Sequence, residues 1–173
     1  MARSYSAALP IAYVVLKILV ILNWLVGAAI LALLVVMPNE QWIMSAFKIG
    51  PSPDADRLIM GLRAIAVVGL VTIPINYLIL RRLLAMVDTV RVGDPFLAGN
   101  GRRLRDIAWA LLSLQLLGLV IAAIVRLIST PEHPVDIDAG FSVNGWLAVL
   151  LTFVLARVFA EGTVMREDLE GTV

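Results

Sequence analysis

The 173-residue sequence contains no cysteine, one histidine and few charged residues. Without cysteine, the chain has no disulfide, no thiolate metal ligand and no thiol chemistry. A haem held by two histidines of one chain is excluded as well, because His133 stands alone. Charged residues form 16% of the sequence, against about 25% in a typical soluble domain. With a net charge of +1, we expect no direct binding of nucleic acid.

Sequence motifs for catalysis are missing as well. The glycine patterns G-x-x-x-x-G-K and G-x-G-x-x-G, which hold phosphate groups, do not occur. No serine has a histidine placed to activate it. A zinc site would need the carboxylates that surround His133, and we favour a solvated acidic loop as the interpretation of this segment. We therefore expect no enzymatic activity, no cofactor and no metal site.

Apolar residues are in excess: they make up 61% of the sequence and give a mean hydropathy of +0.95. Four apolar stretches are long enough to cross a hydrocarbon core of about 30 Å as helices. These stretches lie at about residues 11–37, 58–84, 104–128 and 146–164. Trp146 opens the last one and is expected at the membrane interface. We predict an all-α fold in which residues 1–173 form one integral membrane domain, a four-helix transmembrane bundle.

Positive charge gathers between the second and third apolar stretches. The segment from Arg81 to Asp106 holds six of the 14 lysine and arginine residues. Short loops rich in these residues stay in the cytoplasm. We therefore expect the loop 85–103 to be cytoplasmic, and with four spans both termini share that side. Residues 85–92 can extend the second helix beyond the membrane, and Gly93 is expected to break it.

Three amides are predicted inside the membrane. Asn23 and Gln115 lie near the middle of the first and third stretches, close to the bilayer midplane. Such residues can form a ligand or ion site between helices, or a hydrogen bond that fixes helix packing, which is the interpretation that we favour. Asn76 follows Pro74, and we expect it to bond carbonyl groups that the proline leaves without a partner.

A fourth intramembrane polar residue, Arg157, lies on the last stretch. It is one helical turn from Glu161 and is expected at the depth of Asp106. The three charges can form a proton relay or an ion pair that anchors helices. Because an unpaired charge at this depth would be costly, we predict that Arg157 pairs with Asp106 or Glu161 as a structural anchor.

The cytoplasmic loop and the C-terminal tail supply the candidate partner-binding residues. A proline and a phenylalanine offer a rigid apolar contact among arginines, and aromatic and arginine residues are the usual anchors of interfaces. Acidic residues follow in the tail on the same side. The simpler interpretation is that the arginines contact anionic lipid. The predicted contact residues are Pro95, Phe96, Asn100, Arg102, Arg103, Arg105, Glu167 and Asp168.

Two motifs carry a resemblance to a known family. The loop motif GDPFLAGNGRRLRDIAWALL and the terminal motif LARVFAEGTVMREDLEGTV resemble a bacterial family of small four-helix inner-membrane proteins, the domain of unknown function twenty-nine seventy-five. The loop pattern of that family matches Gly93, Pro95, Phe96, Asn100, Arg103, Leu104 and Arg105. Its terminal pattern matches Phe159, Gly162, Arg166, Glu167, Asp168 and the last four residues, 170–173.

The resemblance implies a location and a partner. Members of the family are often encoded beside a small Cro-type helix-turn-helix regulator. This implies a multi-pass protein of the bacterial inner membrane that binds or sequesters a cytoplasmic transcription factor. The alternative is a transporter or small-molecule binding protein that uses Asn23 and Gln115 in the bundle interior. The expected partners are the lipid bilayer and such a regulator, and the sequence leaves a homo-oligomer open.

Overall fold

The computed structural model describes residues 8–36, 55–92, 98–129 and 140–170. They form four α-helices, which confirms the prediction of an all-α, four-helix fold. Each helix contains a segment long and apolar enough to cross a membrane, as expected for a multi-pass membrane protein. The helices are α1 (Ala8–Val36), α3 (Ala55–Val92), α4 (Ala98–Ile128) and α5 (Val143–Glu170).

Helices α3 and α4 extend beyond the predicted spans toward each other. Helix α3 continues to Val92 and α4 begins at Ala98, so most of the predicted loop 85–103 is helical. The extension of α3 follows from residues 85–92, which contain neither glycine nor proline. Pro74 lies inside α3 without ending it. The acidic segment around His133 lies outside the described residues.

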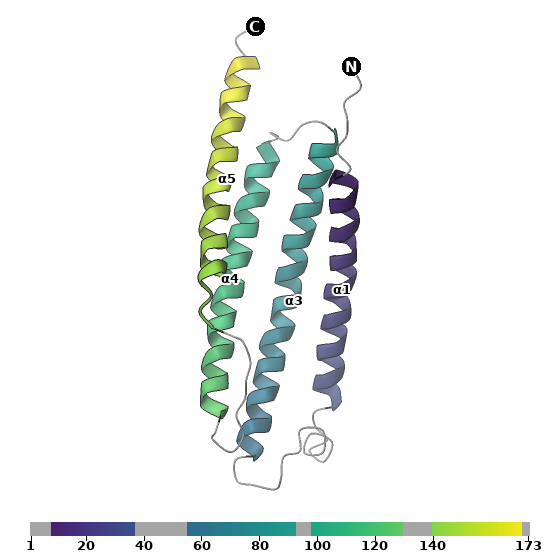
Figure 1. The fold of residues 1–173 in the computed structure, drawn as a ribbon, viewed down its shortest axis with the longest axis vertical. Coiled ribbons are helices and arrows are strands. Elements are labelled where there is room, and N and C mark those ends of the chain that lie inside the picture. The colour runs from purple at the N-terminus through teal and green to yellow at the C-terminus, as the bar shows by residue number, and fades with distance from the viewer. Residues whose placement is uncertain (1–7, 37–54, 93–97, 130–139, 171–173) are drawn as a thin grey trace.

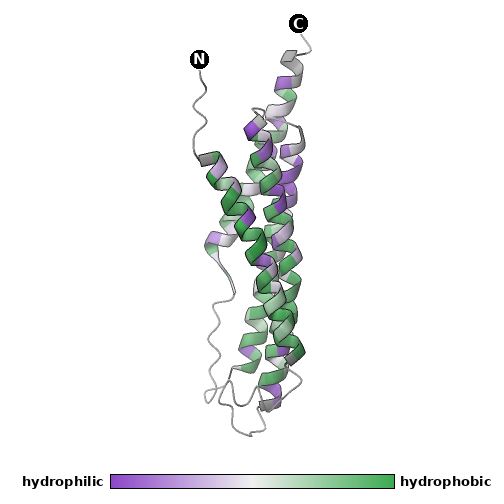
Figure 2. Cartoon of the chain, turned by 90° about the vertical axis from the view of Figure 1, so that its right-hand side faces the viewer, coloured by the Kyte–Doolittle hydropathy of each residue, from purple (hydrophilic) through white to green (hydrophobic). Residues whose placement is uncertain are grey.

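The four helices pack side by side in the order of the chain, as Figure 1 shows. Helix α1 contacts α3, α3 contacts α4 and α4 contacts α5, with neighbours running in opposite directions. The starts of α1 and α4 and the ends of α3 and α5 therefore meet at one end of the molecule. Figure 2 shows hydrophobic residues along the helix bodies and hydrophilic ones mainly toward this end. We call it the basic end because it holds Arg81, Arg82, Arg91, Arg102, Arg103 and Arg105.

Few side chains are buried, because a single row of helices leaves two broad faces uncovered. At the end opposite the basic end, Leu58 and Ile59 of α3 and Ile128 of α4 form a buried cluster. Leu33 and Leu34 of α1 pack against it, so the cluster joins three of the four helices. Most other apolar side chains face outward, as is usual for helices surrounded by lipid.

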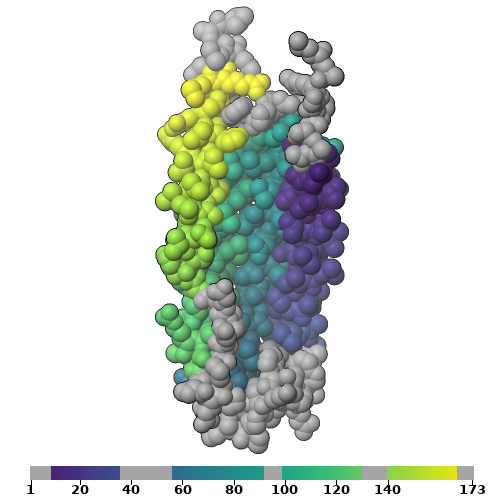
Figure 3. All heavy atoms as spheres, in the orientation of Figure 1, coloured from purple at the N-terminus to yellow at the C-terminus, as the bar shows by residue number. Residues whose placement is uncertain are grey.

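Contacts between α4 and α5 show that α5 is shifted along its axis. Gln115, near the middle of α4, lies against Gly145 in the first turn of α5. Closer to the basic end, Trp109 packs edge-on against Phe153 with ring centroids 5.5 Å apart. Helix α5 therefore begins beside the middle of α4, and its last turns project past the start of α4 (Figure 1 and Figure 3).

The shift corrects the predicted position of Trp146. This residue follows Gly145 and so lies beside the middle of α4, not at its end where an interfacial tryptophan was expected. The small Gly145 lets the two helices approach at Gln115, and this close contact helps to set the axial position of α5.

The packing at Gly61 predicts a loss of stability on adding one methyl group. A Cβ at Gly61 would overlap the buried Ile128 side chain. Gly61→Ala is expected to lower the free energy of unfolding in detergent by about 1–3 kcal/mol, because overpacking forces neighbouring groups to shift. The matched control is Gly69→Ala, whose Cβ would lie at an ordinary 3.6 Å from Ile30 Cδ1. Thermal unfolding followed by tryptophan fluorescence measures both, and equal midpoints would contradict the described contact.

Candidate functional site at the basic end

A network of hydrogen bonds ties α3 to α4 at the basic end. Asn100, in the first turn of α4, is only 1% exposed, and its Nδ2 donates to Thr89 Oγ1 on α3 at 2.9 Å. The Thr89 hydroxyl in turn donates to the carbonyl oxygen of Met86 at 2.7 Å. Arg103 Nη1 donates to Asn100 Oδ1 at 2.7 Å and to the carbonyl oxygen of Ala85 at 3.5 Å. The buried amide is thus paired at both its nitrogen and its oxygen, as burial requires.

This network gives an internal role to two residues that were predicted to contact a partner. Asn100 is buried, and Arg103 is half-buried with its guanidinium directed to Asn100 and the α3 backbone. Arg102 and Arg105 are exposed instead. Of the other predicted contact residues, Pro95 and Phe96 lie outside the described residues. Glu167 and Asp168 belong to the last turns of α5, and their side chains also lie outside the described part.

The predicted charge cluster around Arg157 is divided into two separate ion pairs. Arg157 Nε donates to Glu161 Oε1 at 2.6 Å, one turn along α5. This is one of the two pairings that were predicted for Arg157. Asp106 instead pairs with Arg82 of α3, with an N–O distance of 2.9 Å. Asp106 therefore joins α3 to α4, whereas the Arg157–Glu161 pair lies within one helix. Exposed pairs of this kind contribute about 0–1 kcal/mol in water.

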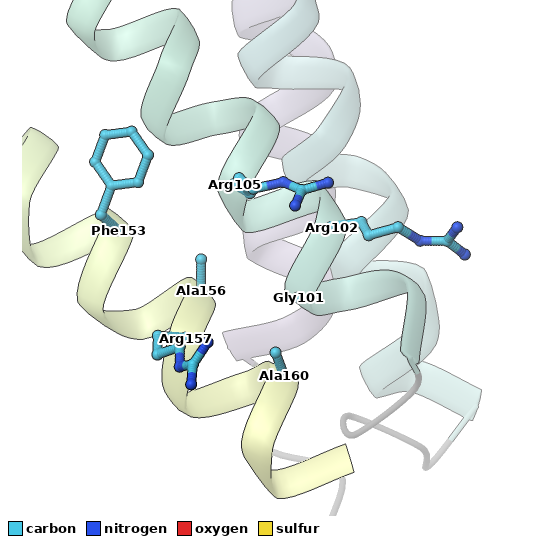
Figure 4. Close-up of a pocket in the computed structure, with 7 residues that line it drawn as sticks. All are labelled: Gly101, Arg102, Arg105, Phe153, Ala156, Arg157 and Ala160. Carbon is cyan, nitrogen blue, oxygen red and sulfur yellow. The ribbon is translucent and has the colours of Figure 1, made fainter. Parts of the chain in front are cut away.

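A pocket of about 280 Å³ opens between α4 and α5 near the basic end. Small residues line its floor: a Cβ at Gly101 would lie 3.3 Å from the backbone nitrogen of Ala160. Figure 4 shows Phe153, Ala156 and Ala160 along α5 facing α4, with Arg157 beside them. Three arginines, two from α4 and one from α5, therefore line one pocket, and in Figure 4 the Arg102 side chain extends away from α5. Its lining residues are Gly101, Arg102, Arg105, Phe153, Ala156, Arg157 and Ala160.

The sequence did not predict that these three arginines line one pocket. Arg102 and Arg105 were assigned to the cytoplasmic partner-binding surface, whereas Arg157 was assigned to an ion-pair cluster inside the membrane, at the depth of Asp106. They share a pocket because the shift of α5 brings Arg157 to the level of the first turns of α4. One signal in the sequence does point to the shift. Only ten residues separate Trp146 from Arg157, too few to cross a bilayer core.

The intramembrane amides lie at different helix interfaces. Asn23 Nδ2 donates to the carbonyl oxygen of Ile73 at 3.2 Å, which joins α1 to α3. Gln115 lies between α4 and α5, against Gly145. Asn76 is half-buried in α3, and among the described residues its side chain makes no hydrogen bond to the carbonyls near Pro74. The structure therefore does not bring Asn23 and Gln115 together.

Comparison with known families gives one match. A family model described as "Protein of unknown function (DUF2975)" matches residues 37–173, which include α3, α4 and α5. This is the family that the loop and terminal motifs resemble, so that prediction is confirmed. No curated protein and no solved structure matches the chain.

The hydrogen-bond network predicts different effects for two adjacent arginines. Arg103→Met removes the donor to the buried Asn100 and is expected to lower the free energy of unfolding by about 1–3 kcal/mol, the usual result of leaving a buried polar group without its partner. Arg102→Met removes the same group from an exposed position and should change stability little. Chemical unfolding in detergent, followed by tryptophan fluorescence, compares the two variants. Equal losses would show that the Arg103–Asn100 bond does not stabilise the helix ends.

Proposed function

The chain belongs to the DUF2975 family, and we propose that it is a non-enzymatic protein of the bacterial inner membrane that holds a cytoplasmic protein at its basic end. The excess of arginine at this end favours a cytoplasmic orientation. In that orientation both chain termini are cytoplasmic too. The proposal assigns regulation, not chemistry, to this end of the molecule.

The observation that carries the proposal is the buried network between Thr89, Asn100 and Arg103. Thr89 lies in the last turn of α3 and Asn100 in the first turn of α4, so the network fixes the two helix ends that flank Pro95 and Phe96. Connections between helices are usually variable surface segments. Fixed helix ends support a contact that depends on the position of an apolar anchor, as docking on Phe96 would.

Charges of both signs at the basic end support a protein partner. Arg102 and Arg105 are exposed on α4. Glu167 and Asp168 belong to the part of α5 that projects past the start of α4 (Figure 1). A basic DNA-binding domain of the Cro type, which the family resemblance implies, would be attracted to these acids. Held there, the regulator would be kept from DNA by occlusion or by tethering, while this chain itself binds no nucleic acid.

The alternative, a transporter or small-molecule binding protein, relied on Asn23 and Gln115 facing one interior space. These two residues lie at the α1–α3 and α4–α5 interfaces, which α3 and α4 separate. No observation on the described residues favours this alternative over docking at the basic end.

Phe96→Ala tests the docking proposal. A buried aromatic anchor contributes more to an interface than a charge at its rim, so this variant should release a tagged regulator, encoded beside the gene, to the soluble fraction. The matched control is Phe141→Ala, an exposed phenylalanine just before α5, which should leave the regulator with the membrane. Cell fractionation and immunoblotting measure the distribution. A regulator that is soluble beside the unmodified protein would contradict the proposal.

The proposed orientation is tested by two single cysteines in a chain that has none. Arg91 and Arg126 are exposed and lie at opposite ends of the molecule. In intact spheroplasts, Arg126→Cys should react with an impermeant thiol reagent, and Arg91→Cys should react only after permeabilisation. A permeant reagent, which should label both variants, is the control. Labelling of Arg91→Cys alone from outside would reverse the orientation and place the basic end away from any cytoplasmic partner.

A further inference from the structure

The pocket between α4 and α5 carries an excess of positive charge. Arg102 and Arg105 form no ion pair within the described residues, and Glu161, the partner of Arg157, neutralises only one of the three guanidinium groups. Among the described residues, no acidic side chain lines the pocket itself. Guanidinium groups bind phosphate well, because their N–H donors match its oxygens in geometry and charge. The pocket is therefore suited to a phosphate group with one or two negative charges.

An apolar groove continues from this pocket along the same two helices. It has a volume of about 600 Å³ and is lined by Leu112 of α4 and by a series of apolar residues on α5. Phe153 lines both the pocket and the groove, so the two are neighbours. Trp146, Leu150, Phe153 and Arg157 follow each other at helical spacing and therefore share one face of α5. The combined site is basic at one end and apolar along the rest of its length.

The dimensions of the site agree with one leaflet of a bilayer. The stretch of α4 without charged residues, 107–125, is about 28 Å long and matches a hydrocarbon core of about 30 Å. This match places Arg102 and Arg105 at the boundary of the core. From Arg157 to Trp146 the groove extends about 16 Å along α5, close to half the core thickness. The basic pocket therefore lies at headgroup depth, and the groove ends near the midplane.

We propose that the α4–α5 site binds one anionic phospholipid from the leaflet at the basic end. Its phosphate lies between Arg105 and Arg157, with Arg102 at the rim of the pocket, and one acyl chain follows the groove past Phe153 to Trp146. A free phosphate would use only the pocket and would leave the apolar groove without an occupant. A soluble protein would not reach the groove at its depth in the bilayer. The inference goes beyond the docking proposal and does not depend on it, because it concerns the lipid-facing seam of α4 and α5.

Quenching of Trp146 fluorescence by brominated lipids tests the proposal. The full chain is reconstituted in phosphatidylcholine nanodiscs that contain a small fraction of brominated phosphatidylglycerol or of brominated phosphatidylcholine. Subtracting the signal of Trp146→Phe isolates the tryptophan in the groove. The wild-type protein is expected to show stronger quenching by the brominated phosphatidylglycerol. The ratio of the two apparent affinities measures the preference for the anionic lipid.

Arg105→Gln is expected to lower this preference about fivefold, and the double variant with Arg102→Gln should lower it further. Both residues are exposed, so the variants should fold, which thermal unfolding verifies. The matched control, Arg81→Gln, removes an exposed arginine from α3 at the same end and should keep the preference.

Three results would overturn the proposal. Equal quenching of the wild-type protein by the two brominated lipids would show that the site does not select an anionic headgroup. Equal losses in Arg81→Gln and Arg105→Gln would show that the general surface charge collects the lipid. Loss of the preference on adding inorganic phosphate at an unchanged ionic strength would show that the pocket takes free phosphate. A lipid site requires the preference to survive that addition. None of these outcomes depends on the regulator, so failure here and failure of docking are distinguishable.

Discussion

The arrangement at the basic end depends on the burial of one amide. Asn100 is the largest side chain that is fully buried among the described residues. A buried amide without partners would cost about 1–3 kcal/mol for each unpaired group, so burial is tolerated only where partners are in place. Thr89 supplies an acceptor and Arg103 a donor, and both lie where the end of α3 meets the start of α4. Movement of either helix end would therefore break bonds that water cannot easily replace.

The other interfaces follow the same physical rule with different residues. Lipid is as apolar as the helix surfaces, so burial of apolar area cannot drive the association of helices in a bilayer. Close packing and polar contacts remain. At the α1–α3 interface, a Cβ at Gly27 would lie 3.1 Å from Ile73, whose carbonyl accepts the hydrogen bond from Asn23. At the α3–α4 interface, the close approach is at Gly61, and the polar contacts are the Asn100 network and the Arg82–Asp106 pair.

The sequence could predict the features that the local sequence of each single helix determines. Helix number, approximate spans and the end with the positive charge follow from local hydropathy and from the distribution of arginine, and the four helices are present. The pairing of Asp106 could not be predicted in this way. Its partner depends on the rotation of α4 relative to its neighbours, and Arg82 of α3 lies closer than the expected Arg157. The position of Trp146 depends likewise on the axial shift of α5. The close contact between Gly145 and Gln115 across the helix interface helps to set this shift.

The segment Asn100–Gly101–Arg102–Arg103–Leu104–Arg105 illustrates why one motif can serve two interfaces. Residues three or four apart on a helix share a face. Asn100 and Arg103 are three apart, and both bond groups of the α3–α4 network. Gly101 and Arg105 are four apart, and both line the pocket against α5, as does Arg102. The helical period thus assigns one arginine to holding the structure together and leaves two for contacts outside the chain. A substitution in this segment can therefore affect stability or binding, and its position on the helix decides which.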